Sequence, residues 1–172
     1  MEGSNASYRT EGCIMSRESV VALKESLEKK LKILKEIQRI GNEQTALLKE
    51  EELDYETFDE LMDSRDVCLE NLNVLDRGFE LVYDKVKGDI EANKSLYSDL
   101  ISEVKVLIGQ ITELTVSIQA MDERNKKMVS DAFVKDRRGL GEAKRSVSVA
   151  YNYYKSMSGV GVDSSRFMDK KK

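Results

Sequence analysis

The chain has 172 residues with no proline, no histidine and no tryptophan, and its two cysteines are Cys13 and Cys68. This length suits one domain with a modest core. The absence of histidine excludes imidazole bases, Ser-His-Asp triads and histidine-ligated metals. Two cysteines cannot complete a zinc site or form a disulfide framework, which favours a reducing compartment. With 35% charged and 40% apolar residues, the proline-free composition indicates long helices.

The first predicted helix follows a polar arm. Residues 1–15 show no hydrophobic period and are predicted to be disordered. Ser16 is a suitable N-cap for a helix that runs to about Glu52. Gly41 lies inside this helix and is expected to weaken it by about 1 kcal/mol relative to Ala. The apolar stripe steps by three or four, with one longer gap bridged by Gln44: Val20, Leu23, Leu27, Leu31, Leu34, Ile37, Ile40, Leu47 and Leu48.

The second predicted helix has two possible starts. Asp54 can cap it, and Thr57 with Glu60 offers a capping box as the alternative. Its apolar seam alternates steps of three and four, as in a coiled coil: Phe58, Leu61, Arg65, Cys68, Leu72, Leu75, Phe79, Val82 and Val86. Cys68 is interpreted as a small buried hydrophobic residue. Arg65 is interpreted either as a snorkelling side chain or as the partner of a carboxylate on a facing helix.

The link to the third helix is predicted at Gly88 and Asp89, where the step pattern breaks. Gly88 would be the C-cap and Asp89 the next N-cap of a tight hairpin, and one bent, continuous helix is the alternative. The seam then resumes without error through Met121: Ile90, Asn93, Tyr97, Leu100, Val104, Leu107, Ile111, Leu114, Ile118 and Met121. The two patterns together predict two further long helices after the first.

The regular pattern weakens after Met121, and Arg138–Gly141 is expected to break the third helix. A short helix over residues 142–156 is expected before a flexible end. The predicted fold is therefore all-α: an antiparallel bundle of three long helices plus a short C-terminal helix and flexible tails. The expected organisation is a disordered arm over 1–15, a helical bundle over 16–137, and a short helix with a basic flexible tail over 138–172.

Charge is distributed unevenly along the chain. Residues 124–172 carry a net charge of +8, whereas residues 1–123 carry −12. This asymmetry indicates two surfaces with different partners, although it is also consistent with a merely solvated tail. No nucleic-acid-reading motif accompanies the basic residues. No segment approaches the roughly 20 apolar residues of a membrane span, and the polar start is unlike a secretory signal, so a cytoplasmic protein without membrane insertion is expected.

The sequence offers little for catalysis. The acidic run Glu50–Glu52, with Asp54 and Asp59 nearby, lies at a helix junction, where solvation and the helix dipole explain carboxylates. Phosphate-binding loops, nucleophile elbows and calcium loops are missing. We therefore expect no enzyme activity, no cofactor and no metal site.

The stretch 118–156 carries apolar and aromatic residues beyond the regular seam. Methionine and tyrosine suit adaptable binding surfaces, so this stretch is predicted to dock a partner helix. The alternative is a fourth helix that packs on its own body. The candidate partner-binding residues are Ile118, Met121, Asn125, Met128, Phe133, Leu140, Tyr151 and Tyr154. A rival function is a structural coiled coil, a self-associating tether without cargo whose seams close between chains in a homodimer.

Several segments resemble the flagellar export chaperones of the FlgN and FliT kind. The resemblance covers roughly residues 16–172. It rests on Leu27-x3-Leu31-x2-Leu34, Glu43-Gln44-Thr45-Ala46-Leu47-Leu48, Asp54-x3-Phe58-x2-Leu61, Leu69-x2-Leu72-x2-Leu75, Ser117-Ile118-Gln119-Ala120-Met121-Asp122-Glu123-Arg124-Asn125-Lys126, and Ala150-Tyr151-Asn152 with Ser165-Arg166-Phe167-Met168-Asp169-Lys170-Lys171-Lys172.

This resemblance implies a small cytosolic helical chaperone. Such proteins bind the C-terminal helices of hook–filament junction proteins or of the filament cap, and they hand this cargo to the export gate. The family's C-terminal region carries the cargo contact, which corresponds to residues 118–156 here. A tyrosine in the same region helps docking at the export apparatus, and Tyr151 and Tyr154 are the candidates.

Overall fold

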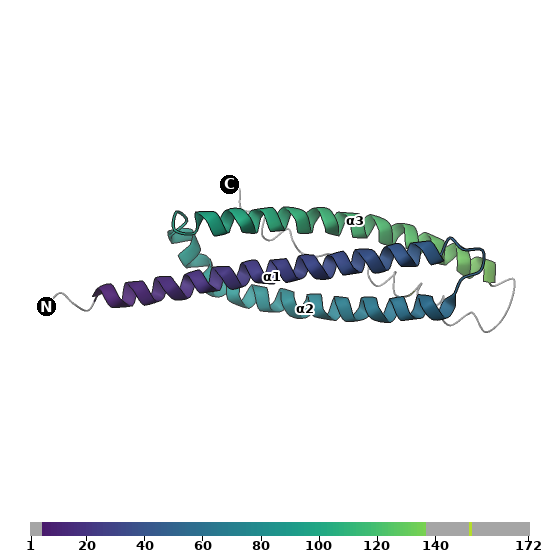
Figure 1. Cartoon of the computed structure of the whole chain (residues 1–172), viewed down its shortest axis with the longest axis horizontal. Helices are drawn as coiled ribbons and strands as arrows, with labels where there is room; N and C mark the ends of the chain where they lie inside the picture. The colour runs from purple at the N-terminus through teal and green to yellow at the C-terminus, as the bar shows by residue number, and fades with distance from the viewer. Residues whose placement is uncertain (1–4, 137–151, 153–172) are drawn as a thin grey trace. The chain divides into compact units, whose positions relative to one another are not determined.

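The structure is a computed structural model that describes residues 5–136 and Asn152. The described residues form three long helices, α1 (Asn5–Leu47), α2 (Tyr55–Ala92) and α3 (Ser98–Asp136), which are labelled in Figure 1. The residues that are described contain no strand. The predicted all-α fold with three long helices is thus confirmed. The short helix predicted over 142–156 lies outside the described residues except for Asn152.

The contacts divide the chain into two compact units, and each unit takes a segment from all three helices. Unit 1 comprises Met1–Leu34 and Leu69–Ile111, and unit 2 comprises Lys35–Cys68 and Thr112–Lys172. Each unit has its own buried core, because the apolar stripes of its three segments meet inside it.

In unit 1 the first-helix stripe is buried as predicted, except that Leu31 is half-buried. Ion pairs flank this core: Lys24 binds Glu103 of α3, and Lys30 Nζ lies 2.6 Å from Asp76 Oδ1 of α2. The buried apolar residues of unit 1 are Val20, Leu23, Leu27, Leu34, Leu72, Val86, Tyr97 and Ile111. The stripe and the two later seams therefore close on one another within a single chain.

In unit 2 the direction of the helices follows from pairs of contacts. Gln38 bonds Ser117 and Thr45 bonds Asn125, so the α1 and α3 segments are parallel. Arg65 binds Asp122, whereas Phe58 clusters with Val129, so the α2 segment runs antiparallel to α3. The core of unit 2 consists of Ile37, Ile40, Phe58, Met62, Ile118, Met121 and Val129.

The start and the end of α1 differ from the prediction. Residues 5–15 are helical where a disordered arm was expected, and Ser16 lies inside the helix rather than at its cap. The physical reason is that no proline interrupts this segment, so the helix propagates upstream of the apolar stripe. Residues 1–4 lie outside the described part. The helix ends at Leu47, before the predicted end near Glu52. The residues that follow form a turn, in which the Glu50 N–H donates to Leu47 O at 3.1 Å.

Asp54 caps α2, as one of the two alternatives predicted. The Thr57 N–H donates to Asp54 Oδ1 at 3.1 Å and the Thr57 hydroxyl donates to Asp54 Oδ2 at 2.7 Å. These two bonds lower the pKa of the Asp54 carboxyl. The helix begins at Tyr55, so the alternative start at Thr57 is wrong.

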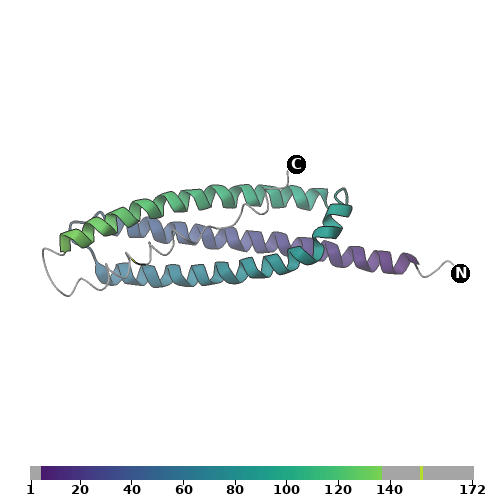
Figure 2. The same ribbon diagram turned by 180° about the vertical axis from the view of Figure 1, so that it is seen from behind.

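The hairpin predicted at Gly88 is also wrong, because α2 continues through Gly88 to Ala92. No described glycine has a positive φ, so Gly88 does not adopt a left-handed cap. The link lies at residues 93–97, between α2 and α3 (Figure 2), which also excludes one continuous helix. Asp89 stabilises this turn instead of capping α3, since its carboxylate accepts bonds from Asn93 Nδ2 (2.8 Å) and from the buried Tyr97 hydroxyl (2.7 Å).

Candidate partner-binding site

A buried ion pair crosses the core of unit 2. The Arg65 side chain is 0% exposed, and its Nη2 donates to Asp122 Oδ1 at 2.7 Å and to Oδ2 at 2.6 Å. The Asp122 side chain is 16% exposed. The interpretation of Arg65 as the partner of a carboxylate on a facing helix is confirmed, and the snorkelling alternative is wrong because the guanidinium does not reach solvent.

This ion pair is not fully satisfied. Burial raises the pKa of the Asp122 carboxyl, and the neighbouring Arg65 offsets only part of that effect. Arg65 Nε and Nη1 are buried and have no hydrogen-bond acceptor among the described residues. Buried donors without acceptors cost about 1–3 kcal/mol each. The pair therefore fixes which helix faces meet, but it contributes less to stability than an apolar contact of the same size.

A second polar contact within unit 2 joins Asn125 of α3 to Gly41 and Thr45 of α1. Asn125 is fully buried, and its Nδ2 donates to Gly41 O at 3.0 Å. The Thr45 hydroxyl lies 2.7 Å from Asn125 Oδ1 and 2.8 Å from Gly41 O, and donates its one proton to either. We call Gly41, Thr45, Arg65, Asp122 and Asn125 the polar layer. It sets the register of the three segments, because a shifted helix would leave these buried groups unpaired.

Gly41 is unfavourable for helix propensity, but it allows close packing between α1 and α3. A Cβ at this position would overlap with Met121 Cε and lie 2.8 Å from Met121 Sδ and 3.0 Å from Arg65 Nη1. The missing side chain thus lets α3 approach α1 closely. Because the backbone of α1 is within reach, Asn125 can bond the Gly41 carbonyl.

The predicted partner-binding residues fall into four groups. Ile118, Met121 and Asn125 are buried in the core of unit 2, so they face its own helices. Met128 is half-buried on α3. Phe133 lies in α3, but its side chain is not described. The remaining predicted residues, Leu140, Tyr151 and Tyr154, lie outside the described residues.

The end of α3 extends past the end of α1. Thr45 pairs with Asn125, α1 ends at Leu47, and α3 continues to Asp136. Val129 of α3 is buried in a cluster with Phe58 and Met62, against which Leu47, Leu48, Leu53 and Tyr55 pack. Beyond it, Val134 is 55% exposed. Val134, in the final turns of α3, is therefore an exposed apolar side chain beyond the end of α1.

Sequence reasoning missed Asp122 and Val134. Asp122 directly follows the seam residue Met121. Arg65 in the seam of the second helix was the one sequence feature that indicated a buried acidic partner. Val134 lies on no predicted seam. Its importance depends on where α1 ends, and sequence reasoning placed that end five residues too late.

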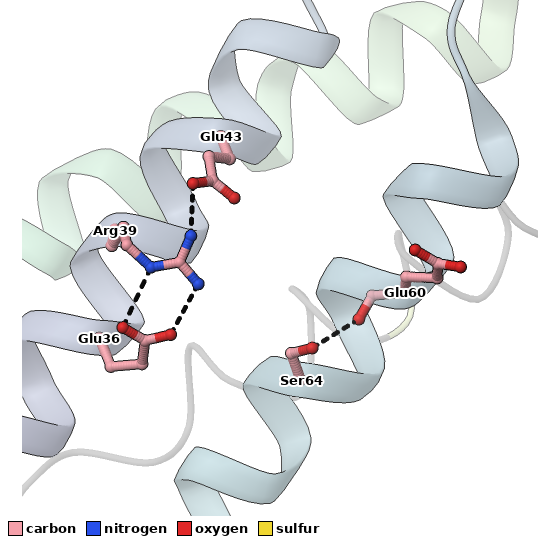
Figure 3. Close-up of polar contacts among 5 residues, drawn as sticks. All are labelled: Glu36, Arg39, Glu43, Glu60 and Ser64. Atoms are coloured by element: carbon pink, nitrogen blue, oxygen red, sulfur yellow. Dashed lines mark hydrogen bonds and ion pairs between the residues drawn. The ribbon is translucent and has the colours of Figure 1, made fainter.

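On the surface of unit 2, several polar side chains of α1 and α2 bond within their own helix (Figure 3). Arg39 donates to both Glu36 oxygens, at 3.0 and 2.6 Å, and to Glu43 one turn later. The Arg39 guanidinium lowers the pKa of Glu36. On α2 the Ser64 hydroxyl donates to Glu60 O at 2.9 Å. These bonds stay within one helix, so they stabilise α1 and α2 and leave no ligand-binding geometry.

The described residues contain no group of three metal-ligating side chains, and none of their helices is apolar enough over a sufficient length to cross a membrane. The hollow found on α2 is shallow and lined by Asn73, Asp76, Arg77 and Glu80. The fold and its buried polar layer define an all-α helical-bundle protein.

Comparison with known proteins identifies the family. The family model described as FlgN protein matches residues 15–153, which is more than half of the chain. The chain therefore belongs to the FlgN family, whose members are flagellar type III export chaperones. No curated protein and no solved structure matches the chain.

Proposed function

We propose that this chain is a cytoplasmic chaperone that masks the C-terminal helix of a hook–filament junction protein or of the filament cap. It then delivers this cargo to the flagellar export gate. The chain acts by binding alone, without catalysis, cofactor or nucleic acid. Family membership supports the general role, and the resemblance of the sequence to such chaperones supports the proposed cargo.

One observation carries the location of the binding site. The final turns of α3 extend beyond α1, and Val134 is more than half exposed there, with Met128 half-buried beside the last core residue, Val129. An amphipathic cargo helix would take the place that α1 leaves open. Phe133 and the following Leu140, Tyr151 and Tyr154 complete the proposed contact, and the two tyrosines are also the proposed contact with the export apparatus.

The buried candidates join this contact when the α3 segment separates from its neighbours. Ile118 and Met121 are then available to cargo, together with Asn125. The polar layer makes this separation less costly than in an apolar core, because water solvates the Arg65 donors that lack acceptors and the Asp122 carboxylate. The same layer restores the original register when cargo leaves.

The rival function, a self-associating tether, requires seams that close between chains. Within unit 1 the stripe of α1 and the seams of α2 and α3 bury one another, and the same holds within unit 2. Among the described residues, every apolar member of the predicted seams is buried or half-buried within its own chain, so these seams do not need a second chain to close. This observation favours the chaperone over the tether.

Isothermal titration calorimetry with the C-terminal segments of a junction protein and of a cap protein tests the proposal. We expect one of them to bind the full chain, and Val134→Asp to weaken binding by about tenfold or more, since the charge would be buried. Val116→Asp is the matched control, because Val116 is 59% exposed on the same helix and in the same unit. Deletion of residues 125–156 should abolish binding. Binding that survives this deletion, or equal effects of the two valine variants, would contradict the site.

A further inference from the structure

One face of α2 in unit 1 is turned away from the core and covered by nothing that the structure describes. The residues of this face, named below, lie on one side of the helix because successive residues are turned by 100°. Val74 is 63% exposed and Leu81 is 67% exposed, one on each side of Gly78. The outer face of α2 consists of Glu70, Val74, Arg77, Gly78, Leu81 and Lys85, all of them exposed.

The shape of this face, with a low point at Gly78 between two apolar side chains, suits the packing of a second helix. A Cβ added to Gly78 would meet no atom within 4 Å, so the space in front of it is open. Val74 and Leu81 project on either side of this low point. A crossing helix can therefore approach its backbone closely at Gly78 while it covers both apolar side chains.

We propose that the outer face of α2 binds the same face of a second copy of this chain, with the two helices antiparallel. A two-fold axis between Arg77 and Gly78 places Val74 against Leu81 of the second copy. The same operation places Glu70 against Lys85 of the second copy. Both pairs occur twice, because the contact is isologous.

Charge complementarity distinguishes a second copy from other occupants. Glu70 and Lys85 both lie on the exposed face, and neither forms an ion pair with another described residue. In the antiparallel arrangement each finds the opposite charge on the other copy. In a parallel arrangement Glu70 would face Glu70 and Lys85 would face Lys85, which is repulsive. The sequence of this face is thus complementary to itself in one direction only.

The association is weak by its dimensions. Lys85 lies fifteen positions after Glu70, a length of about 22 Å on a helix. A contact of that length buries less than the ~1,200 Å² that stable complexes require. Arg77 also lies beside the axis, close to Arg77 of the second copy, and these two like charges repel each other. We therefore infer a concentration-dependent dimer that added salt weakens. The inference does not depend on the proposed cargo.

Sedimentation of the full chain at low salt over a wide concentration range tests this. We expect reversible dimerisation that Glu70→Lys and Lys85→Glu each weaken by roughly fivefold or more, because each change places like charges in both pairs. An equimolar mixture of these two variants should dimerise again, since one then carries two lysines and the other two glutamates. The double variant E70K/K85E should recover self-association. Glu80→Lys, an exposed charge reversal on another side of α2, should change nothing.

Two results would overturn the proposal. The first is a chain that stays monomeric at the highest concentrations, with E70K and K85E equally monomeric when mixed. The second is a dimer that neither single variant weakens, which would assign the contact to another face. Leu81→Asp gives an independent reading, because it removes the apolar contact without changing Glu70 or Lys85, and it should abolish the dimer.

Discussion

The backbone of Gly41 lies directly against the side chain of Met121, with no room for a Cβ between them. This contact opposes helix propensity, which favours Ala over Gly by about 1 kcal/mol. We expect Gly41→Ala to lower the free energy of unfolding by about 1 kcal/mol, because the buried Met121 has to move within a filled core. Urea denaturation measures the change.

A double-mutant cycle isolates the cause of that loss. In a Met121→Ala background the obstructing sulfur and methyl groups are gone and only Arg65 Nη1, 3.0 Å away, remains close to the new Cβ, so Gly41→Ala should destabilise the chain less there. The same loss in both backgrounds would show that the side chain of Met121 is not the obstacle.

Gly88 provides the opposite case. It lies inside α2, its φ is not positive, and a Cβ would meet nothing within 4 Å. Gly88→Ala should therefore raise the midpoint of thermal unfolding, with a gain of about 0.5–1 kcal/mol from helix propensity. A loss of stability would instead indicate the left-handed cap of a hairpin at this position.

The Arg65–Asp122 pair should respond differently to the loss of one partner and of both. Asp122→Ala leaves a buried guanidinium without its carboxylate, and we expect a loss of about 3–5 kcal/mol in denaturant unfolding. The joint change Arg65→Met with Asp122→Leu keeps the volume and removes both charges, and it should be neutral or stabilising by about 1–4 kcal/mol.

An exposed pair serves as the control for that experiment. Arg39→Ala removes the bonds to Glu36 and Glu43 on the surface of α1, where water screens the charges. Its effect should be much smaller than that of Asp122→Ala. Equal losses from the two variants would show that burial does not determine the energy of the inner pair.

The helix cap at Asp54 predicts a pH dependence. The Thr57 hydroxyl and N–H lower the pKa of the Asp54 carboxyl in the folded state. Its contribution to stability is therefore complete above the unfolded pKa of about 4, and it is lost as the pH falls through the lower folded pKa. Wild-type chain and Asp54→Ala should differ in unfolding midpoint at pH 7, and the difference should shrink on acidification. A constant difference would contradict the cap.

Seam spacing predicted the three helices and most of the buried residues, because burial follows the helical period wherever the stripe is continuous. Turn positions were harder to predict. Gly88 and Asp89 look like a cap and a helix start, but the Asp89 carboxylate is used by Asn93 and Tyr97 across a turn that lies further along the chain. Such bonds form only once the turn exists, so local sequence does not indicate them.

The candidate site shows a related limit of sequence reasoning. Ile118 and Met121 belong to an apolar stripe that fits a partner helix and a helix of the same chain equally well. Only the position of their neighbours places them inside unit 2. The accessible residue Val134 was missed for the same reason, since its exposure depends on the end of another helix.

Cys68 offers a chemical means to observe the opening of unit 2. It is half-buried in the α2 seam, and burial raises the pKa of its thiol. At neutral pH very little of it is thiolate, so alkylating reagents should modify the closed chain slowly. Separation of the helices would return the thiol to water and speed its modification. The rate at which Cys68 acquires a label, read by mass spectrometry of its peptide, therefore reports how often this half of the molecule opens.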